Sequence, residues 1–305
     1  MAEHFVQPPH WEYWIALYFF VAGIAGGSYT LATMLRLWGS PRDEATVRIA
    51  FLWAFPLCLV CAAFLTIDLG QPMRFWHMLI NTTPGAAGLN FKLWSPISIG
   101  SWALLLFSVF AFVSFLEVLG KRGNDRSVAD GMIVWNVIGS LVALFLASYT
   151  GVVLSVSNQP VWSDSYSIGG LFVASALSAS AAFLTWMSRY RSDDALATES
   201  RLETADGYFV LLELIMLVSF FVTVSDAGQL WREVRMPWII GWILVLASFI
   251  PPILALVNRG RVRFTASGGA VAATSVASGA SALGAIAVIL GVLILRFVVI
   301  FSAQF

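Results

Sequence analysis

The sequence predicts an all-α membrane protein whose eight transmembrane helices form two parallel-repeat four-helix bundles. Of its 305 residues, 59% are hydrophobic and 11% are charged, whereas ordinary soluble domains have about 45 to 50% apolar and about 25% charged residues. Apolar segments of helix length recur along the chain, and one short polar motif occurs at the ends of two of them. The chain is therefore expected to be an integral membrane protein.

Eight apolar segments are each long enough to cross a hydrocarbon core, which takes about 20 residues of α-helix. They are Trp14–Leu37, Ile49–Ile67, Leu93–Leu116, Gly131–Val156, Ile168–Ser188, Gly207–Ser225, Pro237–Val257 and one helix inside Val271–Phe301. A transmembrane barrel would instead show alternating segments of about ten residues. The pattern therefore favours helices.

Lysine and arginine are distributed unevenly between the connections. The connections that follow the first, third, fifth and seventh segments hold twelve of them: Arg36, Arg42, Arg48, Lys121, Arg122, Arg126, Arg189, Arg191, Arg201, Arg259, Arg261 and Arg263. The other side holds Arg74, Lys92, Arg232 and Arg235, with Arg296 near the end of the last segment. By the positive-inside rule the larger set faces the cytoplasm, so both termini are expected on the outer side.

A weak internal repeat divides the chain into two units. The second segment ends in Asp68-Leu69-Gly70-Gln71 and the sixth in Asp226-Ala227-Gly228-Gln229, and Pro-x-x-Ile-Gly opens the third segment at Pro96 and the seventh at Pro237. Four helices per unit preserve orientation, as in parallel membrane repeats. We predict one bundle over residues 1–165 and a second over 166–305. Chance similarity of short membrane motifs is the alternative.

The outer connection of the first unit, residues 71–94, is much longer than its counterpart in the second. Long ordered loops are usually functional, so it is expected to carry chemistry or a docked partner. It contains Phe75, Trp76, Phe91 and Trp94. Because aromatic residues are enriched in interface cores, these four predict a docking surface.

Ionisable groups at membrane depth are costly and are functional candidates by default. Asp68 is either an interfacial acid paired with Arg74 or a group that exchanges protons. Tyr149, about two turns from the outer end of the fourth segment, either shares a pocket with Asp68 or is an interfacial tyrosine. Glu213 and Asp226 in the sixth segment either mark a proton path, or Glu213 pairs with a neighbouring helix.

The sequence offers few ligands for a redox metal. The three histidines, His4, His10 and His77, all lie outside the apolar segments, whereas a di-haem subunit needs axial ligands that project from its helices. Cys58 and Cys61 stand alone in the second segment, where a zinc or iron-sulfur site would need about four ligands. We expect no haem, no iron-sulfur cluster and no other metal site in this chain.

Several motifs resemble those of the NrfD/PsrC family, the polysulfide-reductase-type quinone-interacting membrane subunits. They are FFVAGIAGGSY, TIDLGQPMRFWHML, LWSPISIGSW, YTGVVLS followed by Pro160 and Trp162, LFVASALSASAA, and a last span bearing Arg296. The second is the most specific. The resemblance extends over nearly the whole length.

The resemblance implies a haem-free subunit of an oxidoreductase complex in a prokaryotic plasma membrane. Such a subunit oxidises a quinol or reduces a quinone, menaquinone or ubiquinone, near the outer side of the first bundle. It exchanges electrons with a ferredoxin-like iron-sulfur subunit, which serves a catalytic subunit such as a molybdopterin enzyme. The periplasmic face would then hold both termini.

The family's Asp-Leu-Gly motif falls on Asp68 and its Tyr-Thr-Gly motif on Tyr149. Asp68 and His77 would then exchange protons, Tyr149 would hydrogen-bond a quinone carbonyl, and Arg74 would hold Asp68 ionised or contact the partner. Tyr18 occupies the region of the first span where some members have histidine or asparagine.

Two other functions fit parts of the pattern. A secondary transporter or a proton-translocating subunit without quinone chemistry would also use parallel repeats and membrane carboxylates, but no pair of Gly- or Pro-broken helices stands at corresponding positions of the two halves. A passive anchor for a peripheral enzyme would leave Asp68 and Tyr149 without a role.

Overall fold

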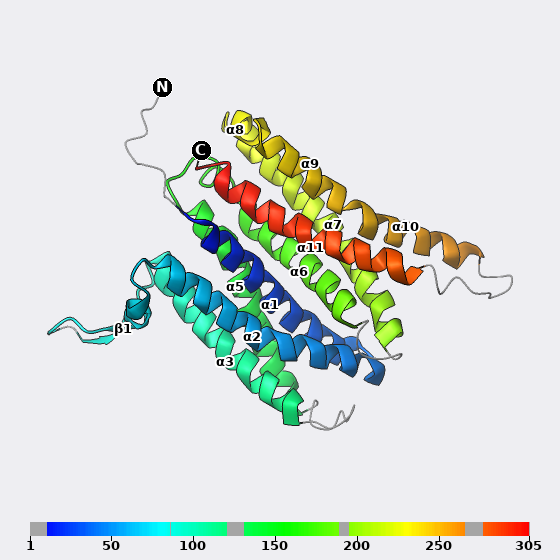
Figure 1. Ribbon diagram of the computed structural model, residues 1–305, viewed down its shortest axis with the longest axis horizontal. Helices are drawn as coiled ribbons and strands as arrows, with labels where there is room; N and C mark the ends of the chain where they lie inside the picture. Colours follow the sequence, from blue (N-terminus) through cyan, green and yellow to red (C-terminus); the bar gives the residue numbers. More distant parts are fainter. Residues whose placement is uncertain (1–10, 86, 121–130, 189–194, 266–276, 305) are drawn as a thin grey trace.

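The computed structural model describes residues 11–85, 87–120, 131–188, 195–265 and 277–304 (Figure 1). Within these ranges eight spans are long and apolar enough to cross a membrane, which confirms the predicted all-α membrane fold. They are α1 (Tyr13–Trp38), α2 (Glu44–Asp68), α3 (Pro96–Gly120), α5 (Ile133–Ser155), α6 (Ile168–Ser188), α7 (Ala195–Asp226), α9 (Trp238–Ser248) with α10 (Ile250–Thr265), and α11 (Ala277–Phe301).

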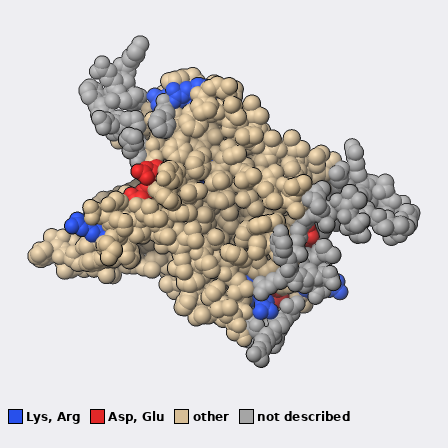
Figure 2. Space-filling view, viewed as in Figure 1, with Lys and Arg blue, Asp and Glu red and all other residues tan. Residues whose placement is uncertain are grey.

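Short elements gather mainly at one end of the helices, which we call the hairpin end. They are the 3-10 helix η2 (Pro72–Met78), the strands β1 (Ile80–Asn81) and β2 (Gly88–Leu89), which pair antiparallel, and the helix α8 (Leu230–Val234). The start of α1 and the finish of α11 lie at this end too (Figure 1). Charged side chains on the visible face cluster toward the two ends, and an uncharged surface separates them, as expected around a hydrocarbon core (Figure 2).

The spans pack as two groups of four that share a central pair. In the first group α1 contacts α2 and α5, and α3 contacts the same two helices; in the second, α6 packs against α7 and α11, and α9 and α10 cover these. α1 and α6 also contact each other, and they are the most enclosed of the eight spans. The central pair therefore joins the two groups.

Small residues bring α1 and α6 together. A Cβ atom added to Gly27 would overlap Ser180 Oγ and lie 2.7 Å from the carbonyl oxygen of Ala176, so only glycine fits there. The hydroxyl of Ser180 donates to the carbonyl oxygens of Gly23 and Ile24, at 3.4 and 3.1 Å. Close approach of helix backbones through small residues is a common basis of helix association in lipid.

Ion pairs close the opposite end of the molecule. The buried guanidinium of Arg36 donates to Glu117 of α3 at 2.9 Å and to Glu44 of α2 at 2.8 Å. Asp43, in the 3-10 helix η1 (Pro41–Asp43), accepts from Thr198 and Arg201 at the start of α7. These contacts tie the three helices of the first group together and join that group to the second.

The paired sequence motif has the same local structure in both halves. α2 ends at Asp68 and α7 at Asp226, and each is followed by a glycine with positive φ, +66° at Gly70 and +72° at Gly228. Glycine adopts this conformation without steric cost and is the usual residue just after a helix. A short helix follows in both halves, η2 and α8. The parallel repeat as a whole remains a prediction that this local match supports.

The seventh span differs from the prediction of one continuous helix. It is divided at Phe249 into α9 and α10, directly before Pro251 and Pro252. Proline lacks the amide hydrogen that a helix interior needs. The third span, its counterpart in the proposed repeat, runs unbroken from Pro96 to Gly120.

The charge sorting and the even number of spans predict that both chain ends face outward. A reporter domain that is active only in the cytoplasm should be silent when fused after Phe305, because the positive-inside rule places the arginine-rich connections inside. The same reporter inserted between residues 121 and 130 should be active. Enzyme assays on intact cells that gave the reverse pattern would contradict this orientation.

Candidate functional site

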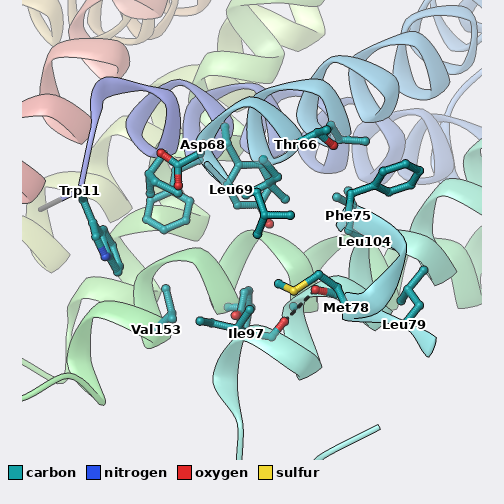
Figure 3. Close-up of a pocket in the computed structure, with 18 residues that line it drawn as sticks. Trp11, Thr66, Asp68, Leu69, Phe75, Met78, Leu79, Ile97, Leu104 and Val153 are labelled. Atoms are coloured by element: carbon teal, nitrogen blue, oxygen red, sulfur yellow. Dashed lines mark hydrogen bonds between the residues drawn. The ribbon is translucent and has the colours of Figure 1, made fainter. Parts of the chain in front are cut away.

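A cavity of about 310 Å³ opens at the hairpin end of the first helix group. Its wall is formed by α1, α2, α3, α5, η2 and the segments beside them. The lining residues are Trp11, Ile15, Tyr18, Phe19, Ala62, Leu65, Thr66, Asp68, Leu69, Phe75, Met78, Leu79, Ile97, Gly100, Ser101, Leu104, Tyr149 and Val153. Figure 3 shows Trp11 and Val153 on one side of this space and Phe75 and Leu79 on the other. The wall is largely apolar, with a few polar groups.

Asp68 contributes the carboxylate of this wall. It is the last residue of α2, and the positive-φ Gly70 turns the chain away immediately after it. Among the described residues no ion pair joins Asp68 to Arg74, while Glu12 is near enough to interact with it electrostatically. The expectation of an Asp68–Arg74 pair therefore has no support in this structure. Asp68 is left available to a bound molecule.

Tyr149 reaches the cavity from α5, and its ring lies against the backbone of α3. Its hydroxyl donates to the carbonyl oxygen of Pro96, the first residue of α3. A Cβ atom at Gly100 would overlap the Tyr149 ring and its hydroxyl. The glycine therefore makes the space that the ring occupies, and the two predicted residues Asp68 and Tyr149 do share one cavity.

Tyr18 on α1 lines the same cavity and is nearly buried, with 3% of its surface exposed. Its backbone carbonyl oxygen lies 4.0 Å from the thiol of Cys61 on α2. Cys58 and Cys61 are both buried and not in a disulfide. Within the described residues no three or more His, Cys, Asp or Glu side chains are arranged to hold a metal ion.

Arg74 and His77 lie beside the cavity rather than in its wall. Both belong to η2, which also carries the lining residues Phe75 and Met78. The His77 ring stacks on Trp76 with 3.8 Å between ring centroids and an interplanar angle of 27°. His4 and His10 lie outside the described residues.

The four aromatic residues of the predicted docking surface are exposed. Trp94 is 81% accessible, Phe75 54%, Phe91 53% and Trp76 39%. The hairpin of β1 and β2 projects away from the helices (Figure 1). Directly after it, the backbone carbonyl oxygen of Asn90 accepts a hydrogen bond from the indole N–H of Trp102 on α3 at 3.2 Å, which holds the hairpin to that helix. Phe75 belongs to both the docking surface and the cavity wall, so a bound partner would sit directly over the cavity.

Glu213 and Asp226 lie far apart on α7. Thirteen residues separate them, which is roughly 20 Å along a helix and more than half a turn around it. Glu213 is buried and Asp226 is exposed. A direct path between the two therefore has no support from their positions.

Three buried charged residues in the second helix group had no role assigned from the sequence. Arg296 of α11 stacks on Phe172 of α6, with its guanidinium carbon 3.8 Å from the ring centroid. Asp206 lies seven residues before Glu213, a helical spacing visible in the sequence. Glu233 in α8 accepts from Trp242 at 3.1 Å and from Ser302 at 2.6 Å. Ser302 is distant in sequence, so no local pattern could have identified Glu233.

Comparison with known proteins gives a match over almost the whole chain. The family model described as "Polysulphide reductase, NrfD" covers residues 3–305. A component of the polysulfide reductase of Wolinella succinogenes is 24% identical to this protein, over 96% of the present sequence and 94% of the relative.

Two further relatives are subunits of other reductases. A subunit of the selenate reductase of Mesobacillus selenatarsenatis is 22% identical over 82% of this chain and 67% of its own length. A subunit of the tetrathionate reductase of Salmonella typhimurium is 32% identical over 57% of this chain and 48% of its own length. Each of the three relatives is thus one part of a reductase.

The contact between Gly100 and Tyr149 gives a test of the cavity's construction. Gly100→Ala should displace the Tyr149 ring and destabilise the protein by about 1 to 3 kcal/mol, the usual range for overpacking a tight contact. Thermal unfolding in detergent would measure this as a lowered melting temperature. Gly88→Ala is the matched control, because a Cβ atom there meets no atom within 4 Å. Equal melting temperatures for the two variants would show that Tyr149 is not held as described.

Proposed function

We propose that this protein, which belongs to the polysulphide reductase NrfD family, is the quinone-reactive membrane subunit of a multi-subunit oxidoreductase. The observation that carries the proposal is the cavity at the hairpin end, where Asp68, Tyr149 and Tyr18 line a largely apolar space. The three relatives, each one part of a reductase, support membership of a larger complex.

The cavity suits the ring of a menaquinone or ubiquinone. Its volume of about 310 Å³ is at the lower end of the range for ligand pockets, which are mostly apolar with a few polar groups that fix orientation. Leu69, Ile97 and Leu104 offer apolar surface to the ring faces, while Asp68 and Tyr149 offer polar atoms to its oxygens. Ala62 and Ile97, on neighbouring helices, are exposed, so the space is accessible from the lipid between α2 and α3.

When bound, the quinone supplies two-electron redox chemistry that is coupled to two protons. Asp68 takes up or gives protons at its carboxylate, which has no competing ion pair within the described residues. Tyr149 donates its hydroxyl hydrogen to a ring carbonyl, exchanging its present acceptor, the Pro96 carbonyl. General acid and base groups are effective when they lie within hydrogen-bond reach of the reacting oxygen.

His77 and Arg74 form the outer edge of this site. His77 lies on η2 next to the lining residue Met78, and an imidazole ring can both accept and donate protons. It passes protons between Asp68 and the outside, while Arg74 contacts the partner subunit. Tyr18 limits the depth of the cavity at the α1 wall.

The hairpin end binds an iron-sulfur, ferredoxin-like subunit that leads to a catalytic subunit such as a molybdopterin enzyme. The exposed aromatic residues Phe75, Trp76, Phe91 and Trp94 form the contact, in keeping with the enrichment of aromatic residues in interface cores. Because Phe75 belongs to both the contact and the cavity wall, electrons would cross at this side chain. The chain itself then needs neither haem nor an iron-sulfur cluster.

The arrangement favours this function over a secondary transporter. Transporters of the repeat type bind substrate between discontinuous helices at corresponding positions of their two halves. Here the break at Phe249 has no counterpart in α3. A passive anchor would not need a lined cavity beneath its docking surface.

The proposed location is a prokaryotic plasma membrane, with the hairpin end and both termini on the periplasmic side.

Substitutions at the cavity test the quinone assignment. Asp68→Asn keeps the size of the side chain and removes its titratable proton, so quinol-linked turnover of the assembled complex should fall by about 10² to 10⁴, the range for losing a general acid or base. Tyr149→Phe should mainly weaken quinone binding, by about 0.5 to 1.5 kcal/mol for one ordinary hydrogen bond. Steady-state kinetics with varied quinol concentration would separate the two effects.

Asp226→Asn is the internal control for these variants, because it changes the same residue type at the repeat-equivalent helix end. It should leave quinol-linked turnover unchanged. Wild-type turnover in an intact Asp68→Asn complex would refute the site, and loss of turnover in Asp226→Asn alone would move the chemistry to the second helix group.

Crosslinking tests the docking surface. A photoreactive group at Asn81 or Thr83, in and beside the exposed hairpin, should capture an iron-sulfur protein in native membranes, since both positions lie on the proposed contact. The same group at Gly120, at the opposite end of α3, is the control and should not capture it. Identification by mass spectrometry of equal capture at both ends, or none at the hairpin, would argue against docking there.

A further inference from the structure

Trp11 lies directly before α1 and lines the cavity, although no role was predicted for it from the sequence. Its ring meets that of Phe19, another lining residue, edge to face, with the ring centroids 6.1 Å apart. Figure 3 shows the indole ring at the edge of the cavity, on the same side as Val153. Trp11 therefore presents an aromatic surface to a molecule that occupies this space.

Trp11 is held in place by residues that are distant in the sequence. Its backbone N–H donates at 3.0 Å to the side-chain oxygen Oε1 of Gln304, which is 293 residues away and lies just after α11. Its ring packs on Trp162, with 5.0 Å between the ring centroids and an interplanar angle of 33°. Trp162 is not among the residues that line the cavity, so it lies behind Trp11. Both the backbone and the ring of Trp11 are thus fixed by contacts from outside α1.

Trp162 is in turn fixed to the end of α11. Its side chain is fully buried, and its indole N–H donates to the carbonyl oxygen of Val299 at 2.8 Å. Three residues earlier, the amide Nε2 of Gln159 donates to the carbonyl oxygen of Ala303 at 2.6 Å. The connection between α5 and α6 is thereby joined to the last turn of α11 and to the residues that follow it. We call Gln159, Trp162 and Gln304 the clasp.

The backbone of this connection is strained at Val161. Its φ angle is +77°, which is rare for a β-branched residue, and its side chain is fully buried. The N–H of Val161 donates to the carboxylate oxygen Oδ2 of Asp164 at 3.0 Å, which helps to hold the turn. Backbone strain of this kind persists only where the surrounding contacts impose it, and such positions cluster at functional sites. Since Val161 directly precedes Trp162, the conformation of this turn determines where the ring that supports Trp11 lies.

An indole ring fixed in this way suits the recognition of a quinone ring. Aromatic rings attract each other when they are stacked with an offset, and such pairs contribute more than the apolar area that they bury. A side chain that is already ordered loses little conformational freedom when a ligand binds. Because Trp162 and Gln304 hold Trp11, stacking on this residue has a small entropic cost.

We propose that Trp11 stacks on the ring of the quinone and that the clasp positions it, so that α11 and the α5–α6 connection contribute to quinone affinity in the first helix group. The inference rests on the proposed quinone function and adds a binding residue to Asp68 and Tyr149. Those two residues engage the oxygens of the quinone, whereas Trp11 engages the face of its ring. The residues of the clasp act only through Trp11 and are positioning residues.

Kinetics of the purified complex test this inference, with a short-chain naphthoquinol and a short-chain benzoquinol as probes. Trp11→Leu should raise KM for the naphthoquinol about 2- to 12-fold, which corresponds to about 0.5 to 1.5 kcal/mol of stacking energy. The value of kcat should stay near that of the wild type, because stacking contributes equally to the ground state and the transition state. The rise in KM should be smaller for the benzoquinol, because its single ring offers less area to the indole.

Trp38→Leu is the matched control, because it makes the same change at the last residue of α1. Trp38 lies at the end of α1 away from the cavity and is 77% exposed. Its replacement should leave KM and kcat for both probes at wild-type values.

Gln304 separates positioning from a general loss of structure. Gln304→Met keeps the length of the side chain and removes the oxygen that accepts from Trp11, so KM should rise less than in Trp11→Leu, again at unchanged kcat. Gln304→Glu keeps an accepting oxygen and should have a KM close to that of the wild type. If Trp11→Leu does not assemble, Gln304→Met decides the inference.

Each outcome supports or overturns the inference. A rise in KM that is larger for the naphthoquinol, together with the recovery in Gln304→Glu, supports it. An unchanged KM in the assembled Trp11→Leu complex, an equal rise for both probes, or a loss of kcat alone overturns the stacking role and leaves the quinone function in place. A wild-type KM in Gln304→Met overturns the positioning by the clasp. Absence of turnover with both probes in the wild-type complex refutes the proposed function, and this inference with it.

Discussion

The close approach of α1 and α6 is the contact on which the rest of the arrangement depends. In lipid, helices gain little by hiding apolar surface from one another, so association relies on tight packing and hydrogen bonds. Gly27 and Gly23 have no side chains to hold the helices apart. The Ser180 hydroxyl therefore lies close enough to α1 to donate hydrogen bonds to its backbone carbonyl oxygens. α1 thereby forms one wall of the cavity and at the same time borders the second helix group.

The two ends of the molecule differ in how their polar groups are used. At the opposite end Arg36 and Asp43 satisfy their charges with partners on neighbouring helices, so that end is closed by mutually compensated pairs. At the hairpin end Asp68 has no such partner within the described residues, and hydrophobic side chains of η2 and the hairpin are exposed. Unpaired acid and exposed aromatic surface are unfavourable unless something binds to them. The asymmetry is why we assign recognition and chemistry to the hairpin end.

The positions of the eight spans could be predicted from the sequence because each span is a long apolar run, and about 20 consecutive apolar residues strongly indicate a transmembrane helix. It also placed Asp68 and Tyr149 together, since both lie near the same end of neighbouring spans. It could not show that Tyr149 donates to Pro96, because that contact depends on the missing side chain at Gly100 in a helix far along the chain. Of the two alternatives that it left open for Asp68, the ion pair with Arg74 has no support within the described residues, and Arg74 lies on η2 beside the cavity. The break at Phe249 was signalled only by Pro251 and Pro252, which helices in membranes often tolerate.

The separation of the cavity from the buried carboxyl groups limits how the two can influence each other. Neither carboxylate oxygen of Glu213 has a hydrogen-bond partner within the described residues, so no chain of hydrogen bonds joins it to Asp68. Influence must therefore be electrostatic or steric. In a low-dielectric interior a change of charge at the cavity acts over a longer range than in water, and the guanidinium of Arg296 is a fixed charge beside the intervening Phe172. A displaced Phe19 would press on the same ring. Phe19, Phe172 and Arg296 thus form one continuous line of contacts from the wall of the cavity to the second helix group.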